Sequence, residues 1–427
     1  MKPAKISFLL VLLFIMILAA SCSNEKNETA STSTFKAYEG ESIELVIHST
    51  GLSDVLFEEV VQPVVRAKYP NIELKLVKDN LEEMLASNIT LDIVGTAGIA
   101  VGDMVRLDIP EDVSPLLKKF NVDLSRIEPA IVSELKEISA LMDKDGSMLA
   151  MPFWMHQGTL IYNQDIFDRF GEAYPKESMT WDEMLDLSKK LTRVEGDTQY
   201  IGGAVNSYVN IFRQYGAGYS DPETNEVYLT SDKHVHVASL IKGFLDIPGY
   251  IQDTNYRHTN FSSGTVAMYT NWMGVIANQF SANPVNFEWD LTTYPVFPEN
   301  PNYGAPADYL VFLVSKASPN KEAAFRVLIE LLTDETQRAV AMKGWGSVLN
   351  DTDIKKAFGT ESGVFQGKNL DAVFKVVAAP NPPYFEHRTE VNNAINELVR
   401  KMALEKVDIN TALREAEEEA KQNILDK

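Results

Sequence analysis

The chain has little of what catalysis and nucleic-acid binding usually require. Its 427 residues include one cysteine, Cys22, so no disulfide forms within the chain and no other thiol is available for catalysis. There is no GxSxG elbow, no phosphate loop ending in GKS or GKT, and no third glycine after residues 216–218 (GAG) to complete a dinucleotide turn. The net charge of −21, without a Lys/Arg-rich run, disfavours nucleic acid as a partner.

Metal and acid–base chemistry also lack a defined candidate. The six histidines are scattered, and His234 and His236 would fall on different faces of a helix, which disfavours a shared metal ion. Residues 143–146 (DKDG) lack the downstream ligands of a calcium loop and suit a tight turn. A glycosidase pair stays open, because such carboxylates meet in space and the chain has 60 acidic residues. We therefore expect no metal, no cofactor and no enzyme activity.

The first residues form an export signal. Two lysines precede an apolar run over residues 6–18, and three small residues, Ala19–Ser21, lead into Cys22. This order indicates a signal peptide over residues 1–21, since the apolar run is shorter than the about 20 residues of a spanning helix. Cys22 resembles the lipobox cysteine of bacterial lipoproteins, although Leu18 stands one place earlier than the lipobox leucine. We expect lipidation at Cys22; an ordinary secretory signal with a free cysteine is the alternative.

Strand-like and helix-like segments alternate beyond a polar stretch, residues 22–35, which we expect to be a flexible tether. Strand patterns occupy residues 43–48, 72–77, 91–95, 158–163, 265–269 and 308–315. Helical patterns occupy residues 55–65, 80–88, 165–170, 184–191, 232–246 and 320–342, with two more helices after residue 391. Thr180 and Glu183 have capping-box spacing, and Asp408 is a candidate N-cap. The alternation predicts an α/β fold with a parallel sheet.

Residues 146–163 (GSMLAMPFWMHQGTLIYN) are the first of several segments that resemble a known protein family. This segment resembles the stretch of bacterial extracellular solute-binding proteins, family 1, in which the chain crosses from one lobe to the other. Further segments resemble that family in the family's order: YPKESMTWDEMLDLSKKLT (174–192), FSSGTVAMYTNWMG (261–274), PVFPE (295–299), SPNKEAAFRVLIELLTDETQ (318–337) and DINTALREAEEEAKQ (408–422). Together they identify the chain as a maltose-binding-protein-like member of this family.

The resemblance implies a two-lobe α/β periplasmic-binding-protein fold, type II-like, with a hinge that closes a ligand between the lobes. Lobe one would hold residues 36–151 with 301–343, and lobe two would hold residues 152–300 with 344–427.

The resemblance further implies a monomeric, lipid-anchored, extracellular substrate-binding component of an ABC importer. Such a protein captures a sugar or oligosaccharide and delivers it to the transmembrane permease subunits, without nucleic acid as a partner. Two alternatives stay open: a lipid-anchored glycoside hydrolase, and a protein of the same fold that binds a non-sugar solute.

Candidate ligand-binding residues come from two sources. In α/β sheets ligands lie beyond the carboxyl ends of the strands, which indicates His48, Ser49, Thr50 and Thr96. The resemblance adds a set from the crossing and from loops that line the cleft in the family: Phe153, Trp154, His156, Trp272, Trp345, Asn206, Tyr208, Asp308, Tyr309, Tyr384 and Arg388. Aromatic rings suit the apolar face of a sugar, and polar side chains suit its hydroxyls. For each tryptophan, burial in a lobe core is the alternative.

Overall fold

The structure is a computed structural model of the chain and describes residues 38–144, 146–221 and 224–426. The expected signal peptide, the tether and Cys22 lie outside the described residues. Among the residues that are described, no helix combines the length and apolar composition needed to cross a membrane.

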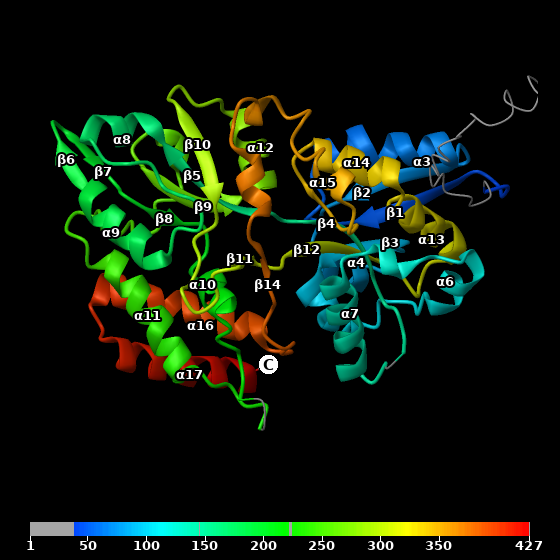
Figure 1. Ribbon diagram of the computed structural model, residues 1–427. Coiled ribbons are helices and arrows are strands. Elements are labelled where there is room, and N and C mark those ends of the chain that lie inside the picture. Colours follow the sequence, from blue (N-terminus) through cyan, green and yellow to red (C-terminus); the bar gives the residue numbers. More distant parts are fainter. Residues whose placement is uncertain (1–37, 145, 222–223, 427) are drawn as a thin grey trace, which may run out of the picture. The chain divides into compact units, whose positions relative to one another are not determined.

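The first sheet has the strand order β13-β4-β12-β3-β1-β2 (Figure 1). β1, β2 and β3 pair in parallel, and β12 lies between β3 and β4, antiparallel to both. The strands are β1 (Ile43–His48), β2 (Ile72–Val77), β3 (Ile93–Ala97), β4 (Met151–Met155), β12 (Tyr309–Val314) and β13 (Gly346–Ser347). The helices of this part are α2 (Asp54–Leu56), η1 (Phe57–Val61), α3 (Gln62–Lys68), α4 (Leu81–Ala86), η2 (Gly98–Ala100), α5 (Val101–Arg106), α6 (Ser114–Phe120), η3 (Leu124–Arg126), α7 (Pro129–Leu141), α13 (Lys321–Glu330), α14 (Asp334–Met342) and α15 (Thr352–Lys355).

The second sheet has the strand order β10-β5-β9-β8 and is mostly antiparallel. Its strands are β5 (Gly158–Asn163), β8 (Ala204–Val205), β9 (Met268–Trp272) and β10 (Trp289–Thr293), with the pairs β6 (Arg193–Glu195) and β7 (Thr198–Tyr200), and β11 (Tyr303–Pro306) and β14 (Val377–Ala379), beside it. The helices are α8 (Gln164–Phe170), α9 (Trp181–Leu191), α10 (Tyr208–Tyr215), α11 (Asp232–Leu245), η4 (Phe261–Ser263), α12 (Met273–Ala282), η5 (Gly363–Phe365), η6 (Leu370–Phe374), α16 (Arg388–Arg400), η7 (Lys401–Glu405) and α17 (Ile409–Leu425).

Each sheet has its own hydrophobic core. The first core takes its buried residues from 45–154 and 309–354, and the second from 160–305 and 358–420. The chain therefore passes between the cores at residues 155–159, 306–308 and 355–357. Three details differ from the expected lobe boundaries. Phe153 and Trp154 pack in the first core because β4 belongs to the first sheet, and Ala305 packs in the second core. Residues 345–354 contribute to the first core because β13 pairs with β4.

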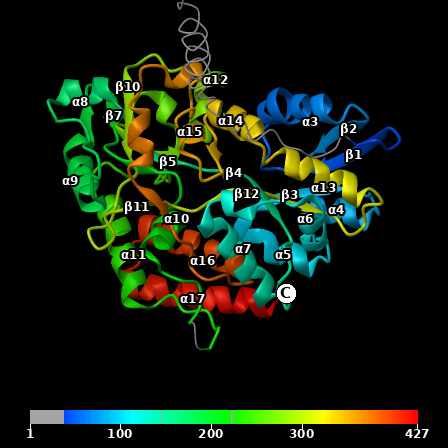
Figure 2. The same ribbon diagram turned by 45° about the vertical axis from the view of Figure 1, so that its right-hand side comes forward.

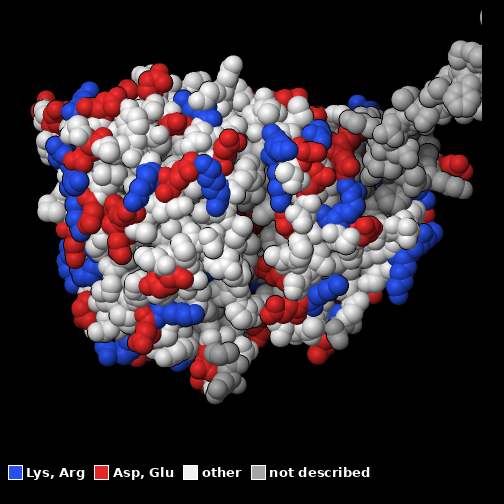
Figure 3. All heavy atoms as spheres, in the orientation of Figure 1, with Lys and Arg blue, Asp and Glu red and all other residues white. Residues whose placement is uncertain are grey.

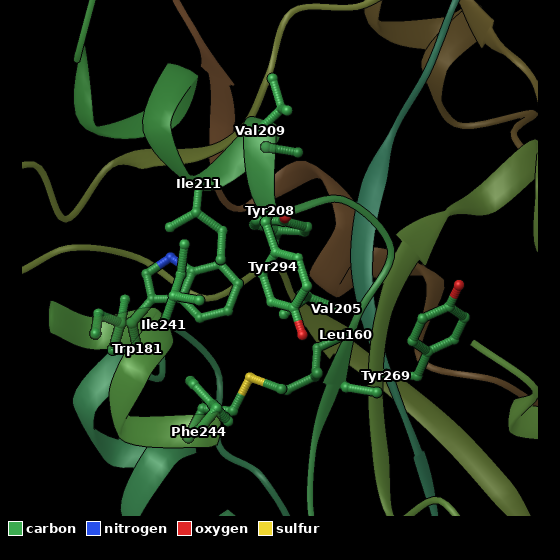
Figure 4. Close-up of a cluster of buried hydrophobic side chains, with 14 of the residues drawn as sticks. Leu160, Trp181, Val205, Tyr208, Val209, Ile211, Ile241, Phe244, Tyr269 and Tyr294 are labelled. Carbon is green, nitrogen blue, oxygen red and sulfur yellow. The ribbon is translucent and has the colours of Figure 1, made fainter. Parts of the chain in front are cut away.

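The centre of the second core is aromatic (Figure 4). Trp181, at the start of α9, is 1% exposed and lies among apolar side chains of α10, α11 and β5. Its indole Nε1 donates a hydrogen bond to Oε1 of Gln214 at 2.9 Å, so the one polar atom of the ring is satisfied inside the core.

Most local patterns are confirmed, and the differences have physical causes. β1, β2 and β5 have the expected bounds, the Thr180–Glu183 capping box is formed, and Asp408 caps α17. The helix expected over residues 320–342 is wrong as one element: it is split into α13 and α14, because the side chain of Thr333 caps a new helix through the backbone N–H of Thr336. The parallel sheet is confirmed in part: β1, β2 and β3 pair in parallel, whereas in the second sheet only β8 and β9 do and the other pairs are antiparallel.

Candidate functional site

Four strands of the first sheet end at the same edge. β2 and β3 pair in parallel with β1, and β3 and β4 both pair antiparallel with β12, so all four run in one direction. The last residues of β1, β2, β3 and β4 are His48, Val77, Ala97 and Met155. β1 also has β2 on one side and β3 on the other. That reversal of strand order is the switch point beyond which open α/β sheets bind ligands.

A pocket of about 540 Å³ lies at this edge, which we call the strand-end pocket. His48, Thr50 and Thr96, three of the residues predicted from strand ends, line it. Ser49 does not: it is fully buried, and its Oγ accepts a hydrogen bond from the backbone N–H of Leu52 at 3.2 Å, which closes the turn after β1. The other lining residues are Gly51, Lys78, Asp79, Asn80, Leu81, Gly95, Ala97, Met104 and Leu310.

The polar groups of the strand-end pocket are mostly uncharged or paired. The His48 Nε2 lies 2.9 Å from the carbonyl oxygen of Asp79, and because a carbonyl only accepts, this nitrogen carries the proton. Lys78 is paired with Asp54 at 2.8 Å. The described lining residues therefore offer hydroxyl, amide and backbone groups and the carboxylate of Asp79, with no unpaired cation to attract an anionic ligand.

Four aromatic rings predicted as ligand contacts meet where the chain first crosses between the sheets. The ring of His156 is stacked on Trp272 at 5.0 Å between centroids, and it also contacts Trp154 at 4.6 Å and Trp345 at 5.3 Å. Trp154 lies at the end of β4, whereas Trp272 ends β9 of the second sheet and pairs with Gly158. The aromatic cluster therefore joins the facing edges of the two sheets. Its tryptophans are 5–8% exposed, so they are packed on one another as well as on the cores.

His156 is held neutral inside this cluster. Burial lowers the pKa of its imidazole to about 4, and the nearby carboxylate of Asp308 opposes this only in part. Its backbone N–H donates to the carbonyl oxygen of Asp308 at 2.7 Å. His156 Nδ1 and the Nε1 of Trp154 are buried and have no hydrogen-bond partner among the described residues. Because buried polar atoms nearly always have a partner, this donor and this acceptor are candidates for contacts with a bound molecule.

Of the other residues predicted as ligand contacts, Phe153 and Tyr208 lie in the hydrophobic cores and Asn206 follows a strand of the second sheet. Phe153 is fully buried against Phe312, at 5.4 Å between centroids, so its ring lies in the first core. Tyr208 is also buried: it lies in the second core, and its hydroxyl donates to the carbonyl oxygen of Tyr256 at 2.9 Å (Figure 4). Asn206 directly follows β8, and its Oδ1 is buried without a partner among the described residues.

Tyr309, at the start of β12, is 1% exposed and packs so closely on Gly98 that a Cβ there would lie 2.1 Å from its ring. Burial raises the pKa of the Tyr309 phenol far above its usual range, so the hydroxyl keeps its proton. Asp308, on the preceding crossing, turns its carbonyl oxygen to His156 as described above.

Tyr384 and Arg388 bind protein groups instead of lining the strand-end pocket. Arg388 forms an ion pair with Asp103 of α5, and Tyr384 accepts a hydrogen bond from Nη1 of Arg106, the last residue of α5, at 3.2 Å. Sequence reasoning placed both residues near a ligand, but it gave no indication of these partners, which lie about 280 positions away in the chain.

A second cavity, of about 640 Å³, lies between α7 and residues 374–384, and Met155 at the end of β4 also lines it. Of the predicted residues Tyr384 lines this cavity, but sequence reasoning missed its α7 wall. Asn381 joins its walls: the Asn381 Nδ2 donates to Oε1 of Glu134 at 3.1 Å, and the Asn381 Oδ1 accepts from Arg213 at 2.6 Å. Burial raises the pKa of Glu134, against the opposing effects of Asn381, Tyr309 and Arg213. No local sequence pattern distinguishes Glu134 from the other acids of α7.

Charges on the surface are mixed in sign. On the face shown in Figure 3, Lys and Arg lie among Asp and Glu without a broad area of either sign. The part of the chain that the structure describes contains no group of three or more His, Cys, Asp or Glu side chains placed to hold a metal ion.

Comparison of the structure with solved structures defines the fold as that of two-lobe periplasmic sugar-binding proteins. An ABC substrate-binding protein from Listeria monocytogenes in complex with cycloalternan superposes with a TM-score of 0.73 at 17% identity, over 91% of this chain and 99% of that one. A maltose-bound MalE3 from T. maritima superposes with a TM-score of 0.66 at 18% identity, over 88% and 99% of the two chains.

The sequence itself matches the model of the bacterial extracellular solute-binding proteins over residues 78–352, and the chain belongs to this family. An arabinooligosaccharide-binding protein from Bacillus subtilis (strain 168) is 24% identical over 258 residues, which are 58% of this chain and 55% of that protein. The match thus spans about half the length of this relative. Both the family and the two-lobe fold expected from the sequence motifs are confirmed.

Proposed function

We propose that this chain is the extracellular substrate-binding component of an ABC importer and captures a sugar or oligosaccharide between its two sheets. The observation that supports this most is that the strand-end pocket and the aromatic cluster both lie at the edge where strands of the first sheet end, and that the cluster also reaches Trp272 of the second sheet. The pocket supplies polar groups and the cluster supplies aromatic faces. Such a combination suits a ligand with an apolar C–H face and a ring of hydroxyls. Relatives and structural neighbours are named as binding arabinooligosaccharide, cycloalternan and maltose.

Within this proposal, the two cores and their sheets are the two lobes, and the three crossings form the hinge. Trp272, Trp154 and Trp345 would supply stacking surfaces, with His156 between them as the polar contact. His48, Thr50 and Thr96 would bind hydroxyls from lobe one, and Asn206 from lobe two. The chain would act as a monomer and pass its ligand to permease subunits.

A thermal-shift screen over arabino-, malto- and manno-oligosaccharides and their monosaccharides tests this function. We expect one carbohydrate class to raise the midpoint of unfolding, because a ligand that binds only the folded chain stabilises it by about 2.7 kcal/mol at 100 times its Kd. Product analysis of each hit then separates the receptor from a glycoside hydrolase, and formation of shorter sugars would reject the receptor. A shift with another solute, and with no carbohydrate, would favour a same-fold protein for a non-sugar ligand.

We also propose that Cys22 is lipidated and holds the chain at the outer side of the cell membrane. The support is the order of charged, apolar and small residues before Cys22. A Cys22→Ser variant, expressed beside the unmodified chain, should move from the membrane fraction to the soluble one. Equal membrane association of the two would contradict the anchor.

A further inference from the structure

Residues 384–388 belong to the second lobe, but their side chains also contact the first lobe. The neighbouring rings of Tyr384 and Phe385 pack on opposite cores, Tyr384 on the first and Phe385 in the second. Arg388, at the start of α16, is 6% exposed and forms its ion pair with Asp103 of α5. This segment therefore connects the lobes at a point that is separate from the three crossings.

Arg106 extends the contact. Its guanidinium donates to Asp103, to the hydroxyl of Tyr384 at 3.2 Å, and to the backbone carbonyl and side chain of Glu386 at 3.0 and 3.2 Å. One carboxylate, Asp103, thus receives an arginine from each lobe. We call Asp103, Arg106, Tyr384 and Arg388 the interlobe clasp.

Close approach of the backbone makes this contact possible. Gly102 precedes Asp103 on α5, and a Cβ at this position would lie 2.1 Å from the hydroxyl oxygen of Tyr384. Any larger residue would push the two segments apart or displace the ring of Tyr384. The clasp is therefore a packed contact and not only a meeting of long charged side chains. Figure 2 shows the backbone of α5 and α16, the helices that carry Asp103 and Arg388.

The clasp lies beside the strand-end pocket. α5 follows the carboxyl end of β3 through η2, and Met104 of α5 lines that pocket. Arg388 lines neither cavity, whereas Tyr384 lines the second one. We infer that the clasp holds the two lobes together next to the strand-end pocket, and that Asp103 and Arg388 are positioning residues for ligand binding.

Separation of the lobes should weaken ligand binding, and this expectation rests on the proposed function. If ligand binds best when the lobes are held together, the measured Kd equals the intrinsic Kd divided by the fraction of molecules in that arrangement. The Arg388 side chain is 8% exposed, so Asp103→Ala leaves a buried guanidinium without its carboxylate, whereas Arg388→Ala leaves Asp103, which is 26% exposed, with Arg106 alone. We expect about a tenfold loss of affinity, or about 1.4 kcal/mol.

Small-angle X-ray scattering of the ligand-free chain tests the clasp independently of any carbohydrate. Arg388→Ala and Asp103→Ala should each increase the radius of gyration, and the double variant should increase it no further. Arg400→Ala is the matched control: it removes an arginine from the same helix whose partners, Glu397 and Glu405, both belong to lobe two. An unchanged radius of gyration in both clasp variants would overturn the inference, and circular dichroism would detect a variant that has merely unfolded.

Calorimetric titration of the same variants separates this inference from the proposed function. Because neither Asp103 nor Arg388 lines either cavity, their variants should weaken every bound carbohydrate by the same factor, while Arg400→Ala should leave each Kd unchanged. Factors that differ between carbohydrates, or affinities equal to those of the unmodified chain, would reject a positioning role. If the unmodified chain binds no carbohydrate, the proposed function fails, and the scattering result still decides the clasp.

Discussion

The buried side chain of Gln337 gives the sharpest prediction about how the aromatic cluster is held. It is fully buried on α14, and its Nε2 donates to the carbonyl oxygens of Phe153 and Leu331, each at 2.8 Å. Its Oε1 accepts from the hydroxyl of Ser347 at 2.8 Å and from the N–H of Val348 at 3.0 Å. One amide therefore fastens β4 and β13, the strands that position Trp154 and Trp345.

Gln337→Leu keeps the volume of the side chain but removes all four hydrogen bonds. Each buried partner left unsatisfied costs about 1–3 kcal/mol, so even with some relaxation we expect a loss of at least ~3 kcal/mol. For lobes of this size, 1 kcal/mol corresponds to roughly 2–4 °C in Tm, so the first lobe should unfold at least ~6 °C earlier. Differential scanning calorimetry measures this, with Gln279→Leu on the exposed face of α12 as the control.

Two outcomes would refute the reasoning about Gln337. The first is a decrease in Tm below about 2 °C, because the buried carbonyls would then have found other partners at little cost. The second is an equal decrease in the control. We also expect weaker ligand binding by Gln337→Leu, since the positions of both tryptophans depend on the strands it fastens.

Three further predictions concern the site itself. Trp272→Phe should weaken carbohydrate binding about tenfold (~1.4 kcal/mol) in calorimetry, because a stacking surface is reduced. The control Trp289→Phe, on β10 in the second core, should leave Kd unchanged. Equal effects of the two variants would refute a contact at Trp272. Gly102→Ala should enlarge the ligand-free chain in scattering, since its Cβ would meet the hydroxyl of Tyr384, and an unchanged profile would contradict that close approach. Finally, because burial lowers the pKa of His156 to about 4 from 6.5, the neutral ring contributes stability above pH 6.5 that is lost as the pH falls toward 4. Relative to His156→Gln, the unmodified chain should lose up to about 3 kcal/mol over this range in urea unfolding, and parallel pH profiles would contradict the assignment.

Local chemistry explains why part of this fold is predictable from sequence. Alternating residues with bulky β-branched side chains define β1 and β5, and Thr180 with Glu183 defines the start of α9. The break between α13 and α14 was not predicted, because continuous apolar periodicity concealed the capping ability of Thr333. The direction of strands in the second sheet was also not predictable, since β5, β9 and β10 are far apart in the chain and their pairing depends on tertiary contacts.

The candidate site, like the fold, was predictable from the sequence only in part. The rule that ligands lie beyond strand ends depends only on strand order, and a pocket lined by His48 and Thr96 lies at that edge. Ligand binding by these residues stays a prediction. The rule could not reveal that Arg388 has Asp103 as its partner, or that Asn381 joins Glu134 to Arg213. Those contacts connect segments that are distant in sequence, and only the folded chain selects them.

The central claim, capture of a carbohydrate without turnover, is tested most directly by one calorimetric titration. The unmodified chain is titrated with the carbohydrate found in the thermal-shift screen, and the same solution is then analysed for products. We predict saturable binding of one carbohydrate per chain, with the carbohydrate recovered unaltered. Absence of binding by every carbohydrate tried, or recovery of shorter sugars, would contradict the account.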